Sequence, residues 1–186
     1  MKKIVIDCNL TLDEVLKNRQ KLPAPKAVLD RQKITTVTYY SFDGLLHQGQ
    51  IVIDVDLVAD VKVAFEIIRQ TKFPIKSVIP FIDRSSMTDD QKAASMNNSS
   101  AFNYRTIANT DKLSNHAFGR ALDINPQLNP LIQGVNIRPE SAVYNPKVPG
   151  TITAEDQFVI YFKDRGWNWG GEWTDLKDYM HFEKNG

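Results

Sequence analysis

One short segment of the sequence combines residue types that bind metal ions. Residues 114–125 read SNHAFGRALDIN and place His116 and Asp123 seven residues apart, with Gly119 between them to let the chain turn. Side chains alternate in an extended segment, so Asp123 is expected to point away from the apolar face that carries Leu122. An unpaired buried carboxylate costs several kcal/mol, so Asp123 needs a cation or a metal as its partner.

A second candidate lies close to the C-terminus, in the segment DYMHFE of residues 178–183. His181 alternates there with Met180 and Phe182, so its ring is expected to be set off from the apolar face. Two histidines and one aspartate give zinc three ligands and leave a fourth position for water, which is typical of a catalytic site. Zinc lowers the pKa of such a water from about 15.7 toward about 7. Asp178, three residues before His181, is placed to take the proton of that water as a general base.

The residue types by themselves also allow interpretations without a metal site. A His-x6-Asp pair occurs by chance in many proteins, and a lone histidine on a strand is more often structural, which is our interpretation of His47. Glu172 and Glu183 lack the required offset from the last histidine, so neither is expected to be catalytic. Cys8 is the only cysteine, so no intramolecular disulfide can form, and a metal site must use histidines and carboxylates.

Taken together, the two segments resemble a known family. SNHAFGRALDIN resembles the Ser-x-His-x-x-Gly-x-Ala-x-Asp signature of the zinc D-alanyl-D-alanine carboxypeptidases and L-alanyl-D-glutamate endopeptidases, which cut peptidoglycan stem peptides, and it agrees at every fixed position. DYMHF resembles the closing motif of that family, with Asp178 where many relatives have Glu. The stretches GQIVIDVDLVADV, FPI, SMNNSSAFNYR and GWNWGGEW also match, so the resemblance covers the chain from residue 34 to the end.

The resemblance implies a Hedgehog/DD-peptidase-like fold and a function for each matching residue. It implies that His116, Asp123 and His181 bind Zn²⁺ and that Asp178 is the base. It also implies that Arg105 steadies a carbonyl or carboxylate of the substrate, a peptidoglycan stem peptide. The donor fork of a guanidinium suits an oxyanion or a carboxylate, and a surface ion pair is the alternative interpretation of this arginine.

Two features beside these motifs keep alternative roles. Ser114 is expected either to hydrogen-bond the substrate or to brace the turn before His116. The tryptophans of the glycine-rich segment 166–173 either wall a cleft for a muramyl-peptide or form an aromatic cluster in the core or at its rim. These are Trp167, Trp169 and Trp173.

The elements that must position these residues follow from the sequence pattern. Residues 34–40 and 45–53 are rich in β-branched and aromatic residues and flank a turn at Asp43-Gly44, which predicts a hairpin. Apolar residues at helical spacing from 57 to 68 predict an amphipathic helix that stops before Pro74. Short strands are predicted at residues 77–82 and 178–183.

Two polar stretches, residues 85–100 and 125–150, are predicted to be long loops. After them, Thr153 is predicted to cap a helix, with Asp156 in the fourth position of a capping box, and Gly166 to end it. The inner face of this helix is expected to be formed by Phe158, Val159 and Phe162.

This order of elements favours an α+β class with a mainly antiparallel sheet and flanking helices, because it lacks the regular βαβ alternation of a doubly wound fold. The length of 186 residues predicts a single domain. Residues 1–33 are expected to be a lead-in that packs on the main body, and residues 34–186 to form the zinc peptidase domain.

Composition argues against two classes of partner. Lys and Arg number 23 and Asp and Glu number 22, so a net charge of +1 provides no field that attracts nucleic acid. No stretch reaches the roughly 18 apolar residues of a membrane span. The apolar run 4–6 is too short for a signal peptide, although a chain trimmed of its leader has the same appearance. Localisation stays open, with the cell envelope or the exterior favoured by the substrate class, and so does the oligomeric state.

Two functions from different classes remain. The first is a zinc metallopeptidase, and the sequence does not choose between carboxypeptidase and endopeptidase. The second is a non-catalytic zinc-binding interaction module of Hedgehog-like fold. Asp178 and Arg105 favour the enzyme, because a module without catalysis needs neither an acid beside the metal nor an arginine over it.

Overall fold

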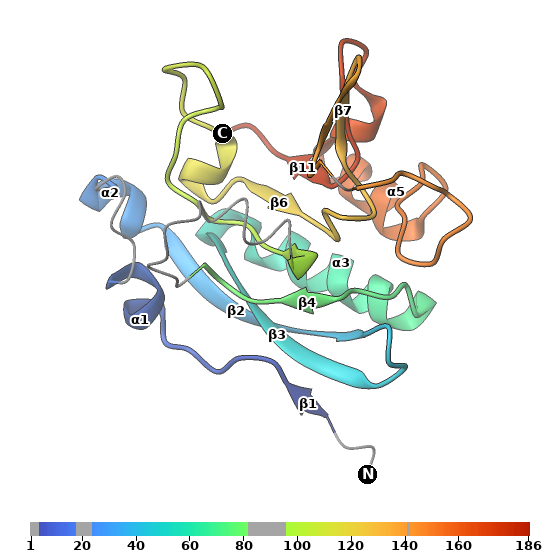
Figure 1. Ribbon diagram of the computed structural model, residues 1–186. Helices are drawn as coiled ribbons and strands as arrows, with labels where there is room; N and C mark the ends of the chain where they lie inside the picture. Colours follow the sequence, from blue (N-terminus) through green and yellow to red (C-terminus); the bar gives the residue numbers. More distant parts are fainter. Residues whose placement is uncertain (1–3, 18–23, 82–95, 141) are drawn as a thin grey trace.

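A computed structural model describes residues 4–17, 24–81, 96–140 and 142–186 of the chain (Figure 1). In these ranges, the protein combines helices with strands that are divided among four small sheets. Among the described residues, five strand pairings are antiparallel and two are parallel. The α+β class expected from the sequence is confirmed, whereas the strands do not join into one sheet. The likeness to a Hedgehog/DD-peptidase arrangement stays a prediction.

The largest sheet is built on the predicted hairpin. β2 (Gln32–Tyr40) and β3 (Leu46–Asp54) pair antiparallel along their whole length. The turn between them uses Gly44 at φ 75°, and the Asp43 carboxylate accepts a hydrogen bond from the backbone N–H of Leu45 at 2.9 Å. β1 (Val5–Ile6) adds a short parallel strand beside β3.

The main core lies between this hairpin and two helices, α3 (Val58–Thr71) and α5 (Gln157–Asp164). A short 3-10 helix, η1 (Val55–Leu57), leads into α3, which ends before Pro74 as the apolar spacing predicts. The helical spacing of α3 and α5 buries one face of each helix, whereas β3 is buried on both faces from Gly49 to Asp54. Buried core side chains include Ile51, Ile53, Val61, Phe65, Ile68, Phe158, Val159 and Phe162.

The start of α5 differs from the expectation. Residues 154–155 form a turn, so Asp156 takes the N-cap position that the capping-box pattern gives to Thr153. The Asp156 carboxylate accepts from the Thr153 N–H at 2.7 Å and from its hydroxyl at 3.2 Å, and so holds the turn before the helix instead of the first helical turn. Gly166 follows the helix at φ 80°, as predicted.

Two small sheets contain the segments that the sequence predicted as a strand at residues 178–183 and as part of a loop at residues 125–150. In the first, β11 (His181–Glu183) lies between β6 (Ala121–Asp123) and β9 (Asn168–Trp169). In the second, β7 (Leu131–Gln133) lies between β10 (Lys177–Asp178) and β8 (Asn136–Arg138).

The predicted strand over residues 178–183 is therefore wrong as one element. A turn at residues 179–180 carries the chain from β10 in one sheet to β11 in another. The predicted loop over residues 125–150 is also wrong in part, because it contains the β7–β8 hairpin, which projects from the body in Figure 1. Its strands are only three residues long, and Gly134 turns the chain between them at φ 58°.

The strand predicted at 77–82 is described only at β4 (Ser77–Val78), which pairs in parallel with β5 (Asn98–Ser99). Residue 82, and the part of the predicted 85–100 loop up to residue 95, lie outside the described residues. β4 approaches β3 closely at Gly49, where an added Cβ would overlap the carbonyl oxygen and Cβ of Val78.

Two helices precede the hairpin, α1 (Leu12–Lys17) and α2 (Lys26–Leu29). Val15 of α1 is fully buried and packs in a small cluster with Val52 and Phe102. The boundary between a lead-in and a main domain at residues 33–34 stays a prediction. No helix in the described ranges is both long and apolar enough to cross a membrane.

Candidate metal centre

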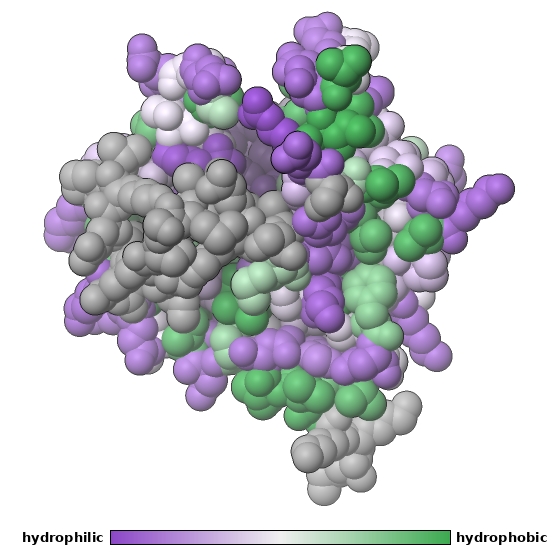
Figure 2. Space-filling model, in the orientation of Figure 1, coloured by the Kyte–Doolittle hydropathy of each residue, from purple (hydrophilic) through white to green (hydrophobic). Residues whose placement is uncertain are grey.

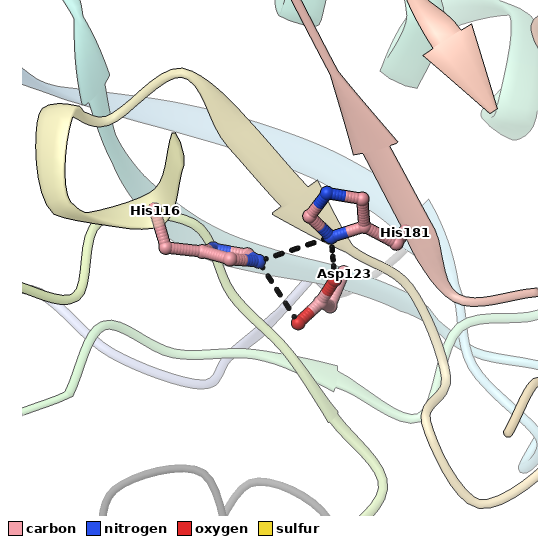
Figure 3. A group of neighbouring side chains, drawn as sticks. All are labelled: His116, Asp123 and His181. Carbon is pink, nitrogen blue, oxygen red and sulfur yellow. Dashed lines mark hydrogen bonds and ion pairs between the residues drawn. The ribbon is translucent and has the colours of Figure 1, made fainter. Parts of the chain in front are cut away.

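Three side chains from separate parts of the chain meet at one point, as Figure 3 shows. His116 lies in the 3-10 helix η2 (Asn115–Phe118), Asp123 ends β6 and His181 begins β11. The antiparallel register places His181 directly opposite Asp123. Each residue offers one ligand atom, and these atoms all lie within 4.8 Å of one another.

The turn that carries His116 is built by its neighbours. Ser114 occupies the N-cap position, and its Oγ accepts a hydrogen bond from the backbone N–H of His116 at 3.3 Å. Gly119 ends the turn at φ 66°, where an added Cβ would lie 2.8 Å from the backbone nitrogen of Asp54. The chain turns here because glycine supplies both the left-handed conformation and the close approach.

Hydrogen bonds on the far sides of the two rings orient their inward nitrogens. The Nδ1–H of His116 donates to the carbonyl oxygen of Ala101 at 2.6 Å, which leaves Nε2 facing the centre. The Nε2–H of His181 donates to a carboxylate oxygen of Glu183 at 3.1 Å, which leaves Nδ1 facing the centre. The two inward nitrogens are 3.2 Å apart.

This donor set fits a zinc ion. The carboxylate oxygens of Asp123 lie 3.0 Å from His181 Nδ1 and 3.2 Å from His116 Nε2. Tetrahedral ligands at about 2.0–2.1 Å from zinc lie roughly 3.3 Å from one another, close to these spacings. Two lone pairs and an anionic carboxylate that converge in this way need a positive charge between them.

The pKa values of the cluster also indicate that it needs a positive charge. Burial opposes ionisation of Asp123, but the adjacent His116 and His181 outweigh it and hold the pKa of this carboxyl far below its usual range. Burial likewise opposes the charged form of His181, yet hydrogen bonds to Asp123 and Glu183 raise its pKa to about 10. Without a metal, a proton therefore supplies the positive charge that the centre requires.

Asp178, the predicted base, lies on β10 next to this cluster. Its Oδ1 atom is buried and accepts no hydrogen bond from the described part of the chain. Burial raises the pKa of Asp178 to about 6, while the charges of His181 and Arg105 act to lower it. Gly170 permits this placement, because a Cβ on it would lie 2.5 Å from the Asp178 carbonyl oxygen and 2.9 Å from the Asp178 Cβ.

Arg105 follows an extended segment that runs beside the ligand-bearing strand. Ser100 forms an antiparallel bridge with Asp123, and the carbonyl oxygen of Arg105 accepts from the backbone N–H of Ser114 at 3.1 Å. The half-buried guanidinium donates from Nη1 to the Thr106 carbonyl at 3.3 Å, and its charge reaches Asp178. The structure thus brings the charge of Arg105 within electrostatic reach of Asp178.

The remaining predicted residues have distinct positions. Ser114 is buried and braces the turn, so a contact with substrate stays a prediction. Trp167 and Trp169 are buried in the main core, whereas half-buried Trp173 lies beside His181, with ring centroids 5.5 Å apart.

Glu183 is the residue that the sequence interpretation missed. Besides the bond from His181, the same carboxylate oxygen accepts from the side-chain amide of Asn115 at 2.7 Å. The hydrogen bond from His181 is the main cause that lowers the pKa of Glu183. The available signal was the alternation of β11, which puts positions 181 and 183 on the same face.

The surface near the centre is hollowed. Figure 2 shows a mainly hydrophilic recess between two projections, which in Figure 1 are the loop of residues 104–113 and the β7–β8 hairpin. β6 and β11, which carry Asp123 and His181, run between these projections.

Comparison with known proteins agrees with this geometry. Residues 108–184 match a family model described as D-alanyl-D-alanine carboxypeptidase, and this range contains His116, Asp123, Asp178 and His181. Searches of curated proteins and of solved structures gave no match. The match confirms the resemblance carried by SNHAFGRALDIN and DYMHF: residues 108–184 of this chain are similar to the D-alanyl-D-alanine carboxypeptidase family of peptidases.

Proposed function

We propose that the protein is a zinc-dependent peptidase that hydrolyses a peptide bond in peptidoglycan stem peptides. The observation that carries this proposal is the convergence of His116, Asp123 and His181, with donor atoms 3.0–3.2 Å apart, beside the buried Oδ1 of Asp178. The similarity of residues 108–184 to a family of peptidases supports the reaction class.

The ligand set would hold zinc through His116 Nε2, an Asp123 oxygen and His181 Nδ1. When bound, zinc polarises a peptide carbonyl and lowers the pKa of water toward about 7. Asp178 accepts the proton of the attacking water at its carboxylate. Because its pKa is raised to about 6, the carboxyl both takes a proton near neutral pH and returns it to the leaving amine.

Arg105 has the complementary task on the substrate. Its charge reaches Asp178, and its guanidinium offers donors suited to the carbonyl oxygen as negative charge develops there, or to a nearby carboxylate. This charge also offsets part of the pKa increase that burial imposes on Asp178.

The bond that is cut decides the type of peptidase, and one experiment identifies it. The zinc-loaded protein is incubated with purified muropeptides, and the products are read by mass spectrometry. Release of free D-alanine marks a D-alanyl-D-alanine carboxypeptidase, and cleavage after the first L-alanine marks an L-alanyl-D-glutamate endopeptidase. If the folded, zinc-loaded protein cuts neither bond but binds a glycan or protein through this face, the non-catalytic zinc module replaces the enzyme.

This substrate class also implies a place of action. Peptidoglycan lies in the bacterial cell envelope, so we propose that the protein acts there or outside the cell. Fractionation of a producing culture, followed by immunodetection in the envelope, medium and cytoplasmic fractions, tests this localisation. Detection in the cytoplasmic fraction alone would contradict it.

A further inference from the structure

The sheet that contains Asp178 also contains Arg138, a residue of the β7–β8 hairpin. Asp178 of β10 pairs with Leu131 of β7, and Leu131 pairs with Arg138 of β8. The three residues thus form one row across the sheet. Directly opposed residues of antiparallel strands direct their side chains to the same face, so Arg138 is on the face of Asp178. Two strand spacings of about 4.7–4.9 Å separate their Cα atoms by about 10 Å.

The two faces of this hairpin differ in character. Strand alternation puts Gln133 and Asn136, an opposed pair, on the face of Arg138. Ile132 and Ile137, also an opposed pair, share the other face. The hairpin face that is shared with Asp178 is therefore polar at Gln133 and Asn136 and positively charged at Arg138.

Arg138 also differs from other arginines of the chain. Arg31, Arg69, Arg120 and Arg165 each lie within 4.0 Å of a carboxylate oxygen of this protein. Arg138 is exposed, and no ion pair or side-chain hydrogen bond occupies its guanidinium in the described ranges. The fold thus leaves one complete guanidinium fork available on the face that carries the candidate base.

We propose that Arg138 anchors the substrate by binding one of its carboxylates. This inference rests on the proposed peptidase function and adds a binding residue to it. An extended peptide advances about 3.3–3.6 Å per residue, so the separation of about 10 Å corresponds to a carboxylate within about three residues of the scissile bond. A guanidinium binds a carboxylate through two parallel N–H···O bonds. A stem peptide offers two such groups, the α-carboxylate of its γ-linked D-glutamate and its C-terminal carboxylate.

Three synthetic peptides test the assignment. The parent is L-Ala-γ-D-Glu-L-Lys-D-Ala-D-Ala, the second has a carboxamide in place of the D-glutamate α-carboxylate, and the third has a carboxamide at its C-terminus. Wild-type protein, Arg138→Gln and Arg138→Lys are compared by kcat/KM and by calorimetric binding of each peptide. Lys147→Gln, which removes an exposed cation from the loop after the hairpin, is the matched control.

The expected result is selective. Arg138→Gln lowers kcat/KM for the parent by about tenfold to about a hundredfold, mainly through KM, because charged hydrogen bonds contribute about 1.5–3 kcal/mol. For the peptide that lacks the anchored carboxylate, wild type and Arg138→Gln give equal values. Arg138→Lys restores part of the difference, since lysine keeps the charge and loses the fork. Lys147→Gln matches wild type on all three peptides.

Two outcomes overturn the inference, and they are distinguishable. If wild type cuts the parent but Arg138→Gln changes the kinetics and the binding of all three peptides equally, or of none, Arg138 does not bind a carboxylate and the proposed function stands. If folded, zinc-loaded wild type neither cuts nor binds any of the peptides, the proposed function fails and the anchoring role fails with it.

Discussion

His181 Nδ1 lies 3.2 Å from His116 Nε2, although 65 positions separate the two residues in the chain. Each ring reaches this position because its other nitrogen donates a hydrogen bond outward, from His116 to the Ala101 carbonyl and from His181 to Glu183. The tautomers that these bonds fix leave two lone pairs directed at one point, which also faces the Asp123 carboxylate. A cation at that point is the simplest way to satisfy all three groups.

The first prediction concerns Glu183, which fixes the ring of His181. Glu183→Ala removes the acceptor for Nε2–H, so the ring can rotate and change tautomer. We expect the affinity for zinc to fall about 10–100-fold, as second-shell changes do elsewhere. Competition with a chromogenic chelator measures it. Glu155→Ala, at an exposed position, is the control. An unchanged zinc affinity in folded Glu183→Ala would show that the strand and the contacts of His181 with Asp123 and Trp173 suffice to hold the ring.

A second prediction separates the base from the ligands. Asp178→Asn should keep zinc but lose about 10²–10⁴-fold in kcat, because an amide cannot take a proton from water. Zinc content by elemental analysis is the control for an intact centre. Turnover close to the wild-type value in the zinc-loaded variant would place the general base at another residue.

The third prediction concerns Gly170, because a substitution there displaces Asp178 and leaves its carboxylate chemically unchanged. In Gly170→Ala, the new Cβ would lie 2.5 Å from the Asp178 carbonyl oxygen, so the spacing between residue 170 and β10 must change. Displacement of a catalytic group by about 1 Å can cost about 10²-fold in rate, and we expect a loss of that order with zinc affinity unchanged. Gly186→Ala is the comparison, since its Cβ meets nothing closer than 3.5 Å. Equal activity of Gly170→Ala and wild type would mean that the site tolerates the shift.

The fourth prediction concerns pH and His47, which lies outside the metal centre. Its Nδ1 and Nε2 lie 2.8 Å and 3.0 Å from carboxylate oxygens of Asp7 and Asp43. Burial disfavours the charged ring, but these two hydrogen bonds outweigh it and raise the pKa of His47. A raised pKa in the folded state stabilises the protein below the unfolded value of about 6.5, and this contribution is lost as pH rises through the folded value.

Comparison with His47→Gln isolates that contribution, because the histidines of the metal centre are common to both proteins. Urea unfolding at about pH 5.5 should show wild type more stable than His47→Gln, and at about pH 9 the difference should be smaller. A stability difference that stays constant between the two pH values, or grows as pH rises, would mean that His47 is neutral in the folded protein.

The residues of the centre could be predicted from the sequence because their spacing reflects local structure. Asp123 at the end of β6 follows His116 by seven positions, and Gly119 turns the chain between them. The alternation of side chains along β6 and β11 sets Asp123 and His181 away from the core. The β2–β3 hairpin could be predicted for the same reason, since its strands are nine residues long and its turn has a clear glycine signal.

Other features depend on contacts that no local pattern contains. The β7–β8 strands have three residues each and largely exposed side chains, so no alternation of buried and exposed positions marks them. Asp178 and His181 appeared to share a strand, but each pairs with a different partner, Leu131 or Asp123, and the chain turns between them. The placement of Trp173 beside His181, with Trp167 and Trp169 in the core, likewise follows from tertiary packing.

Titration of metal-free protein with zinc, followed by calorimetry, tests the central claim most directly. We predict one tightly bound zinc per chain in wild type, with release of protons as the ligands lose them, and loss of most of this affinity in His181→Ala. The control for folding is the circular dichroism spectrum of each protein. A folded wild-type protein that binds no zinc, or binds it as well after His181→Ala, would contradict the assignment of this centre.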